Sequence, residues 1–205
     1  MDFTEAAPSS VKSIKQRDLL NTWLRLYSDH CGPPPYRDYR PGRIEDELLD
    51  MMVFNVVGQC ADARFEIVHE GSRLTAIYSN DRPRTRDELR FLDTAIGPVR
   101  YAAVYPKYRV CIDSRRPVYS ISRVFDANGT EVSYERLLLP FGSAQRIEHI
   151  VGSYKSISLD GRFQFSDLMG PNTRAPIPVL RAVIDPGLYK PAHPQQRPSD
   201  DIVDA

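Results

Sequence analysis

Three β-rich segments follow one another between residues 118 and 157, and they constrain the fold more than any other feature. The first runs from Val118 to Phe125, the second from Thr130 to Leu139, and the third from Arg146 to Ile157. Asn128-Gly129 stands between the first two and is the strongest short hairpin signal, because a type I′ turn needs positive φ at both central residues. Consecutive antiparallel strands form a meander, so the sequence predicts a three-stranded meander here.

Two more strands and a group of short helices are predicted upstream of this meander. Met51 to Val57 is an apolar run of strand length, and Ala63 to Glu70 alternates apolar and polar residues. Helices are predicted over residues 44–49, 72–78, 85–96 and 106–114. Pro98 and Pro106 each suit the first position of a new helix. This order indicates an α+β domain in which helices cover one face of an antiparallel sheet.

The two ends of the chain differ in composition from the middle. Residues 1–13 are small and polar and predict a flexible arm, and residues 14–40 predict a helix followed by a proline-rich loop. Residues 41–166 form the predicted domain. Over residues 167–205 prolines recur and apolar periodicity is lost, which predicts a largely disordered tail. Two apolar patches within residues 177–184 are the exception, and docking on the domain or on a partner is left open.

Composition argues against several classes of protein. Hydrophobic residues make up 41 % of the 205 residues, enough for a packed core. Lys and Arg number 27 and Asp and Glu number 27, a balance that argues against a nucleic-acid binder. No apolar run is long enough to span a membrane. Cys31, Cys60 and Cys111 lie far apart without metal spacing, and no secretory leader opens the sequence, so we expect a cytoplasmic protein.

The sequence contains none of the short motifs that mark common catalytic sites. G-x-S-x-G, G-x-x-x-x-G-K-[ST], H-E-x-x-H and G-x-G-x-x-G are all absent. The four histidines, at positions 30, 69, 149 and 193, include no pair spaced i, i+4 that could hold a metal on one helix face. We therefore expect a protein that is not an enzyme, with no catalytic residues and no bound metal.

The order of elements is similar to the PAS fold, in which two strands and a cluster of short helices precede three strands of one antiparallel sheet. The segment from Ala63 to Ser72 has a strand of the type F-x-x-x-x-x-G before a short helix. The segment from Tyr134 to Phe141 ends in apolar residues and proline, the next strand contains Gly152, and the leading helix carries Trp23. Over residues 16–165 the chain resembles the stand-alone PAS domains of alphaproteobacteria.

This resemblance implies a five-stranded antiparallel sheet with helices on one face, plus an N-terminal helix. It also implies a sensory or regulatory role, in which a small ligand or a partner protein shifts the domain between states and the signal passes by protein contact. Neither Cys60 nor Cys111 matches the N-C-R-F type motif through which photoreceptor PAS domains bind flavin. No histidine stands where haem PAS domains take their iron ligand, so we expect no cofactor.

Six residues are candidates for contact with a small ligand. They are Tyr105, Tyr108, Arg109, Arg123, Arg136 and His149. Arginine forks bind carboxylate and phosphate in bidentate fashion, so the three arginines predict an anionic metabolite in a PAS cavity. Each candidate also has a plainer interpretation: core packing for the tyrosines and a hydrogen-bonded core role for the histidine. The arginines would then pair on the sheet surface with Glu131, Glu135 and Glu148.

The helix predicted from residue 14 presents an apolar stripe. Leu20, Trp23, Leu24 and Tyr27 fall at i, i+3, i+4 and i+7, which is one face of a helix. An exposed stripe of this kind can pack against its own copy across a two-fold axis, so these residues predict the contact of a homodimer. In the alternative, the helix folds back on its own sheet and Trp23 lies in the core of the monomer.

Two other functions remain open at this point. One is an interaction module whose cavity is filled by its own side chains and holds no ligand. The other is a small cone-shaped α+β enzyme, which would need a buried carboxylate near an apolar cavity. Glu66 and Glu135 are carboxylates on predicted strands, but the alternation predicts that both face solvent.

Overall fold

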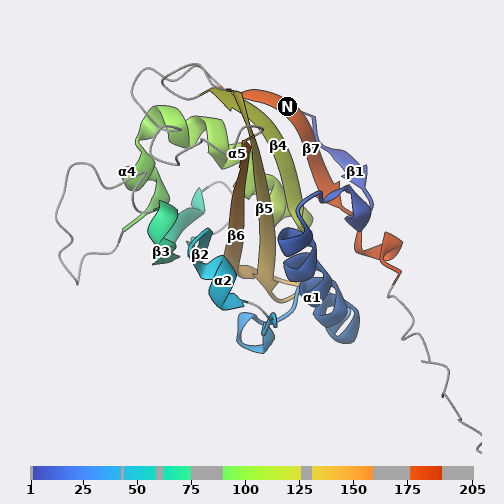
Figure 1. Ribbon diagram of the computed structural model, residues 1–205. Helices are drawn as coiled ribbons and strands as arrows, with labels where there is room; N and C mark the ends of the chain where they lie inside the picture. The colour runs from blue at the N-terminus through green and yellow to red at the C-terminus, as the bar shows by residue number, and fades with distance from the viewer. Residues whose placement is uncertain are drawn as a thin grey trace, which may run out of the picture.

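One mixed sheet of seven strands organises the described part of the chain, in the order β1-β7-β4-β5-β6-β2-β3 (Figure 1). The computed structural model describes residues 2–42, 44–58, 62–74, 90–125, 131–158 and 176–190. The strands are β1 (Thr4–Ala6), β2 (Met51–Val57), β3 (Arg64–Glu70), β4 (Val118–Phe125), β5 (Glu131–Gly142), β6 (Ile147–Ser158) and β7 (Ile177–Ile184). The α-helices are α1 (Ile14–His30), α2 (Ile44–Leu48), α4 (Leu92–Ile96) and α5 (Pro98–Ser114). Short 3-10 turns occupy Pro8–Ser10, Tyr36–Asp38 and Pro186–Leu188.

The predicted meander is present as β4, β5 and β6, which pair antiparallel in sequence order. Strand β2 pairs antiparallel with both β6 and β3, and β7 pairs antiparallel with β4, so six adjacent strands are antiparallel rather than the five predicted. The predicted turn at Asn128-Gly129 lies outside the described residues. On β5, Leu137 and Leu138 face opposite sides of the sheet and both are fully buried. Burial on both sides requires cover on both faces of the sheet.

Both ends of the chain contribute a strand, contrary to the predicted flexible arm and disordered tail. Strand β7 pairs antiparallel with β4, and β1 pairs parallel with β7. Ala182 and Ile184 of β7 are 0 % exposed, and Val11 behind β1 is equally buried. The apolar patches within residues 177–184 thus dock on the domain, which is one of the alternatives that the sequence left open. Pro178 sits at an irregularity of the β4–β7 register, where a missing N–H is tolerated.

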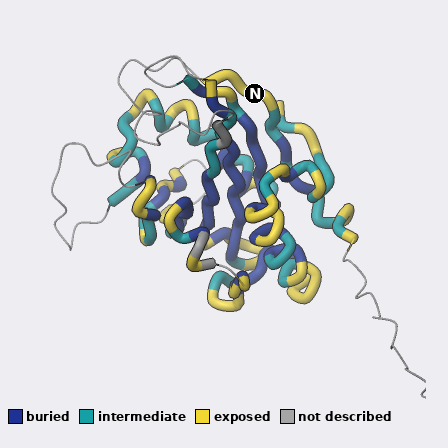
Figure 2. Tube along the Cα trace, in the orientation of Figure 1, coloured by how far each residue is buried: buried dark blue, intermediate teal, exposed yellow. Residues whose placement is uncertain are grey.

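Helices cover both faces of the sheet, and Figure 2 shows the buried central strands between them. Helix α1 packs on one face, in a cluster with β5 residues such as Leu137 and Leu139. Helices α4 and α5 lie on the other face, where Leu92, Tyr108 and Cys111 are buried. The prediction placed helices on one face of the sheet. The structure has α4 and α5 on that face and α1 on the opposite face, so α1 forms a second helical layer.

The apolar stripe of α1 is buried within its own chain, so the predicted dimer contact is wrong. Leu20, Trp23 and Leu24 are at most 1 % exposed. The indole Nε1 of Trp23 donates a hydrogen bond to the Pro140 carbonyl oxygen at 2.7 Å, and the Tyr27 ring stacks on Trp23 with centroids 4.9 Å apart. The alternative holds, in which the helix folds back on the sheet and Trp23 joins the core.

Helix α5 begins at Pro98, as predicted, but it runs without interruption through Pro106. The sequence had assigned Pro106 to the start of a separate helix. A proline inside a helix cannot donate to the carbonyl one turn earlier, which costs the helix a backbone hydrogen bond. The next residue, Lys107, donates from Nζ to the Ala103 carbonyl oxygen at 3.1 Å and so satisfies a carbonyl in the turn that precedes the proline.

Other expectations about helices meet the structure only in part. Residues 72–74 are helical, but most of the segments predicted over 72–78 and 85–91 lies outside the described residues. Among the described helices, none combines the length and the apolar character needed to cross a membrane.

Candidate functional site

Aromatic side chains fill the centre of the space between α5 and the sheet. The hydroxyl of Tyr108 on α5 lies 2.7 Å from the hydroxyl of Tyr154 on β6, and both residues are 2 % exposed. The rings of Phe54 and Phe65 pack against Tyr108, with centroids 5.4 and 4.9 Å away. Tyr108 therefore has a packing role, as its plainer interpretation predicted, and it anchors α5 to the middle of the sheet.

Gly152 makes room for this pair of tyrosines. A Cβ atom at this position would lie 2.5 Å from the Tyr154 hydroxyl and 2.9 Å from two of its ring atoms. Because Tyr154 is held by Tyr108, Gly152→Ala is expected to lower the free energy of unfolding by about 1–3 kcal/mol through overpacking. Gly32→Ala is the matched control, since nothing lies within 4 Å of its added Cβ. Urea unfolding measures both, and equal stability of the two variants would contradict this packing.

Three cationic side chains gather beside the aromatic centre. Arg136 on β5 faces the same side as Leu138, and Arg181 on β7 faces opposite to the buried Ala182, so strand alternation directs both toward α5. Lys107 reaches the same place from α5, and Lys107 and Arg136 are each 8 % exposed. The Arg136 guanidinium lies 5.5 Å from the ring centroids of both Tyr134 and Tyr154. We call Lys107, Arg136 and Arg181 the cation cluster.

Lys107 lies among other positive charges in the cation cluster. Burial, reinforced by the charges of Arg136 and Arg181, lowers the pKa of Lys107 to about 8. Among the described residues, neither Lys107 nor Arg181 forms an ion pair with a carboxylate, and the buried Nε of Arg181 has no hydrogen-bond partner. Lys155 on the opposite face differs, because it lies 2.7 Å from Glu47 and 2.8 Å from Asp50. Buried charges are ordinarily paired in this way.

The lowered pKa of Lys107 gives a prediction about stability and pH. The folded chain releases this proton near pH 8, whereas the unfolded chain holds it until about pH 10.5. Between these values the unfolded state binds more protons, so the free energy of unfolding rises with pH. Lys107→Met is expected to lack this rise and to be about 2 kcal/mol more stable than the native chain at pH 7. Urea unfolding at several pH values tests this, and parallel profiles for the two proteins would contradict it.

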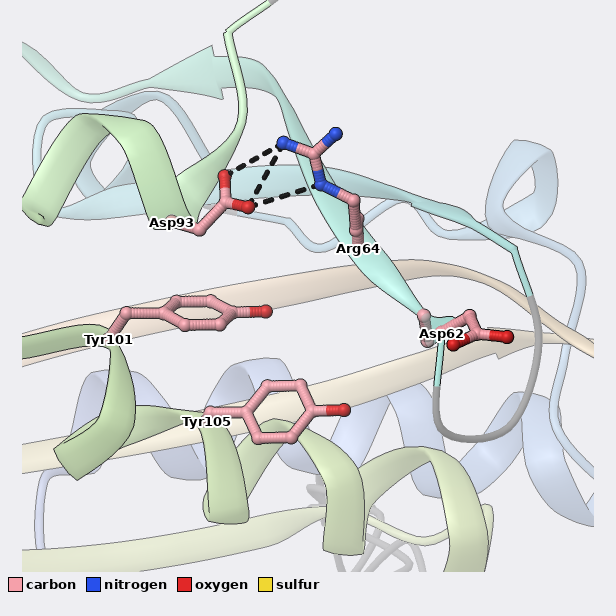
Figure 3. A pocket seen from close by; sticks show the side chains of 6 residues that line it. Asp62, Arg64, Asp93, Tyr101 and Tyr105 are labelled. Carbon is pink, nitrogen blue, oxygen red and sulfur yellow. Dashed lines mark hydrogen bonds and ion pairs between the residues drawn. The ribbon is translucent and has the colours of Figure 1, made fainter. Parts of the chain in front are cut away.

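Tyr105, a predicted ligand residue, lines an open groove at the edge of the fold instead. Figure 3 shows Tyr101 and Tyr105 side by side on α5, with their hydroxyls directed into a groove of about 340 Å³. Arg64 donates two hydrogen bonds of 3.1 Å to Asp93 across it. Burial raises the pKa of Tyr101 to about 12. The charges of Arg64 and Asp93 neutralise each other, and Asp62 adds a negative charge to the lining, so the groove suits the predicted anionic ligand less well than the cation cluster does.

Two of the predicted arginines pair with acidic neighbours. Arg123 lies 3.6 Å from Glu131 on the facing strand, the pairing that the plainer interpretation allowed. Arg109 contacts Asp113 one turn along α5 at 3.1 Å, rather than a glutamate of the sheet. Of the three arginines, the structure brings only Arg136 into the interior beside Tyr108.

His149 lies on the opposite side of the sheet, within a short polar chain. Its Nδ1 is 3.0 Å from the Asn55 side-chain oxygen, and the Asn55 amide donates to Glu66 at 3.0 Å. Burial lowers the pKa of His149 below its usual value. His149 is thus a hydrogen-bonded, half-buried histidine, and it is separated from the cation cluster by the sheet.

Glu135 is buried, contrary to the expectation that it faces solvent. It is 1 % exposed and accepts a hydrogen bond of 2.8 Å from the Tyr119 hydroxyl, on the α1 side of the sheet. The prediction assumed that helices cover only one face of the sheet, so that every second residue of the strand faces solvent. Helices in fact cover both faces. A buried carboxylate is one requirement of the enzyme alternative, but Glu135 does not line the groove of Figure 3.

Lys107 and Arg181 were missed by sequence reasoning. Lys107 was placed at the start of a helix that begins at Pro106, where its side chain has no defined direction. Arg181 was placed in the disordered tail. Reading residues 98–114 as one helix would have put Lys107 next to Tyr108 on the buried side, but the pairing of β7 with β4 has no local signal.

Comparison of the chain with protein-family models, with curated proteins and with solved structures gave no match. Among the described residues, no group of three or more His, Cys, Asp or Glu side chains is placed to hold a metal ion. The functional argument therefore rests on the sequence and on the geometry of the cation cluster.

Proposed function

We propose that the chain is a non-enzymatic, PAS-like sensory or regulatory module that binds a small anionic ligand between α5 and the sheet. Its antiparallel strands β2 and β3, the helices that follow, and the meander β4–β6 occur in the order that the PAS resemblance implies. Strands β1 and β7 extend that arrangement at the β4 edge. The five-stranded PAS sheet is thus part of the proposal, embedded in a larger mixed sheet.

The observation that carries the proposal is the cation cluster. Lys107, Arg136 and Arg181 bring like charges together in a partly dehydrated space, and the lowered pKa of Lys107 reflects first its burial and then the repulsion by the two arginines. An anion bound among them would reduce this repulsion on Lys107. Guanidinium forks favour carboxylate and phosphate oxygens, which defines the ligand class.

Strand β5 offers a route from this site to a partner protein. Arg136 faces α5, and the next residue, Leu137, is buried on the α1 side of the sheet. A ligand that moves Arg136 therefore acts on the packing of α1. The partner, a second copy or another protein, contacts a surface other than the buried stripe of α1.

A filled-cavity interaction module is the second candidate, and a specific observation favours it. The centre of the α5 side is occupied by Tyr108, Tyr154, Phe54 and Phe65, all fully buried. This packing confines any ligand to the end of the space that the cation cluster borders. If the cluster binds no anion, the module acts through its surface alone.

Calorimetric titration with phosphate and with succinate tests the proposal. We expect binding of at least one anion, with affinity reduced about tenfold or more in Arg181→Leu because a charge-assisted contact is lost. Arg123→Leu is the matched control: it removes the same charge from the neighbouring strand β4, where Arg123 pairs with Glu131, and should bind as the native chain does. Absence of binding, or equal losses in both variants, would refute the proposal.

A further inference from the structure

A second concave site lies where α5 ends. It is a cavity of about 230 Å³ among the last turn of α5, the adjoining ends of β2 and β3, and the turn between β5 and β6. None of its described lining residues belongs to the cation cluster or to the groove of Figure 3 except Ala63, which that groove shares. The cavity is therefore a separate candidate for a binding site.

Part of the lining of this cavity is aliphatic. Val56 of β2, Ala63 beside β3 and Ile147 of β6 are each at most 6 % exposed. Ile112 of α5 adds a half-buried side chain, and all four residues belong to the core on the α5 side of the sheet. A short hydrocarbon chain placed here would leave water for an apolar surface, which is favourable.

Two arginines from separate elements line the same cavity. Arg115 follows the last turn of α5, Arg146 lies in the turn before β6, and both are exposed. Within the described part of the chain, neither guanidinium forms an ion pair or a hydrogen bond. Asp113 also contributes to the lining, but it pairs with Arg109 at 3.1 Å. The cavity thus combines positive charge with an apolar lining.

We propose that this cavity binds a small apolar monocarboxylate, whose carboxylate is held by Arg115 and Arg146 and whose hydrocarbon chain lies on the aliphatic lining. A guanidinium fork donates two parallel hydrogen bonds to a carboxylate, which favours this group over other acceptors. The volume is below the range of drug-sized ligands, so it suits a chain of a few carbons. The inference goes beyond the proposed function, because it concerns a different site.

The backbone of Arg115 allows a variant that separates binding from stability. Arg115 has a φ of 54°, in the left-handed region where glycine is usual after a helix. Its backbone N–H donates to the Ile112 carbonyl oxygen at 3.3 Å, a bond that does not involve the side chain. Arg115→Gly removes the guanidinium and relieves the backbone, so the unfolding midpoint should stay unchanged or rise. A purely structural role of the side chain predicts a lower midpoint.

Titration of the full ¹⁵N-labelled chain with hexanoate, followed by NMR, is the test. We expect saturable shifts at Ile112 and Ile147, and an affinity that falls about fivefold or more in Arg115→Gly and in Arg146→Gln. Arg17→Gln is the matched control, because it removes an exposed arginine from α1 on the opposite face of the sheet, and it should bind as the native chain does.

Two further ligands separate the contributions of charge and apolar surface. Hexanamide keeps the hydrocarbon chain of hexanoate without its charge, and acetate keeps the carboxylate without most of the chain. Each should bind about fivefold or more weakly than hexanoate, because each forms only one of the two kinds of contact. Equal affinity of hexanamide and hexanoate would overturn the inference.

The outcomes also separate this inference from the proposed function. If hexanoate binding is lost in Arg181→Leu but kept in Arg115→Gly and Arg146→Gln, the ligand lies in the cation cluster, so the inference fails and the proposed function stands. If hexanoate does not bind while phosphate or succinate does, again only the inference fails. If hexanoate binds as expected here while neither phosphate nor succinate binds at the cation cluster, the inference stands and the proposed function fails.

Discussion

A chain that ends at residue 170 is expected to lose its cooperative unfolding transition. This truncation removes β7, whose Ala182 and Ile184 are fully buried against the α1 side of the core. It also leaves β1 without the strand with which it pairs in the described sheet and opens the edge of β4. Loss of this burial and of two strand pairings costs an estimated 4 kcal/mol or more, roughly the whole stability of a marginal domain.

Thermal unfolding followed by circular dichroism measures this effect. A chain that ends at Lys190 is the matched control, because it keeps every described element, and it should unfold at the native midpoint. A midpoint for the shorter chain within a few degrees of the native value would show that β7 contributes little.

Replacement of Trp23 by alanine is expected to lower the free energy of unfolding by about 3–5 kcal/mol. The side chain is 0 % exposed, and its removal leaves a large cavity between α1 and the sheet. The Pro140 carbonyl also loses the hydrogen bond that it accepts from Nε1.

Trp23→Phe separates these two contributions. It keeps most of the ring volume and removes the donor, so it should cost clearly less, about 1–2 kcal/mol. Urea unfolding of the three proteins gives the comparison. A cost below about 1 kcal/mol for Trp23→Ala would mean that α1 does not depend on this contact.

The sequence was sufficient to predict the strands and helices whose apolar residues recur with a regular spacing. The meander over residues 118–157, the two strands before it and the stripe of α1 all follow from alternation or helical spacing. Strand β1 escaped because three residues are too few to show a period. Strand β7 escaped because Pro178 and its neighbouring prolines resemble a disordered tail. Both strands depend on partners more than 50 residues away in sequence, as in the register of Tyr119 with Ala182.

The candidate site was predictable only where the strand pattern was known. Arg136 lies on a correctly predicted strand, on the same side of the sheet as the buried Leu138. The sequence could not show that Arg109 and Arg123, unlike Arg136, form ion pairs with acidic neighbours. Their pairing with Asp113 and Glu131 depends on the folded arrangement and not on residue type. Arg181 depended on the unpredicted strand β7.

Measurement of the Lys107 pKa by NMR, through the side-chain carbon next to its amine, tests the central claim most directly. The claim is that burial and the neighbouring guanidinium charges lower the pKa of Lys107 until an anion binds beside it. In buffer without anionic ligands, the account predicts a pKa near 8. On addition of phosphate or succinate, the pKa should rise toward the ordinary lysine value of about 10.5. A pKa already near 10.5 in the ligand-free chain would contradict the account, since Lys107 would then feel neither the burial nor the repulsion that the account assigns to it.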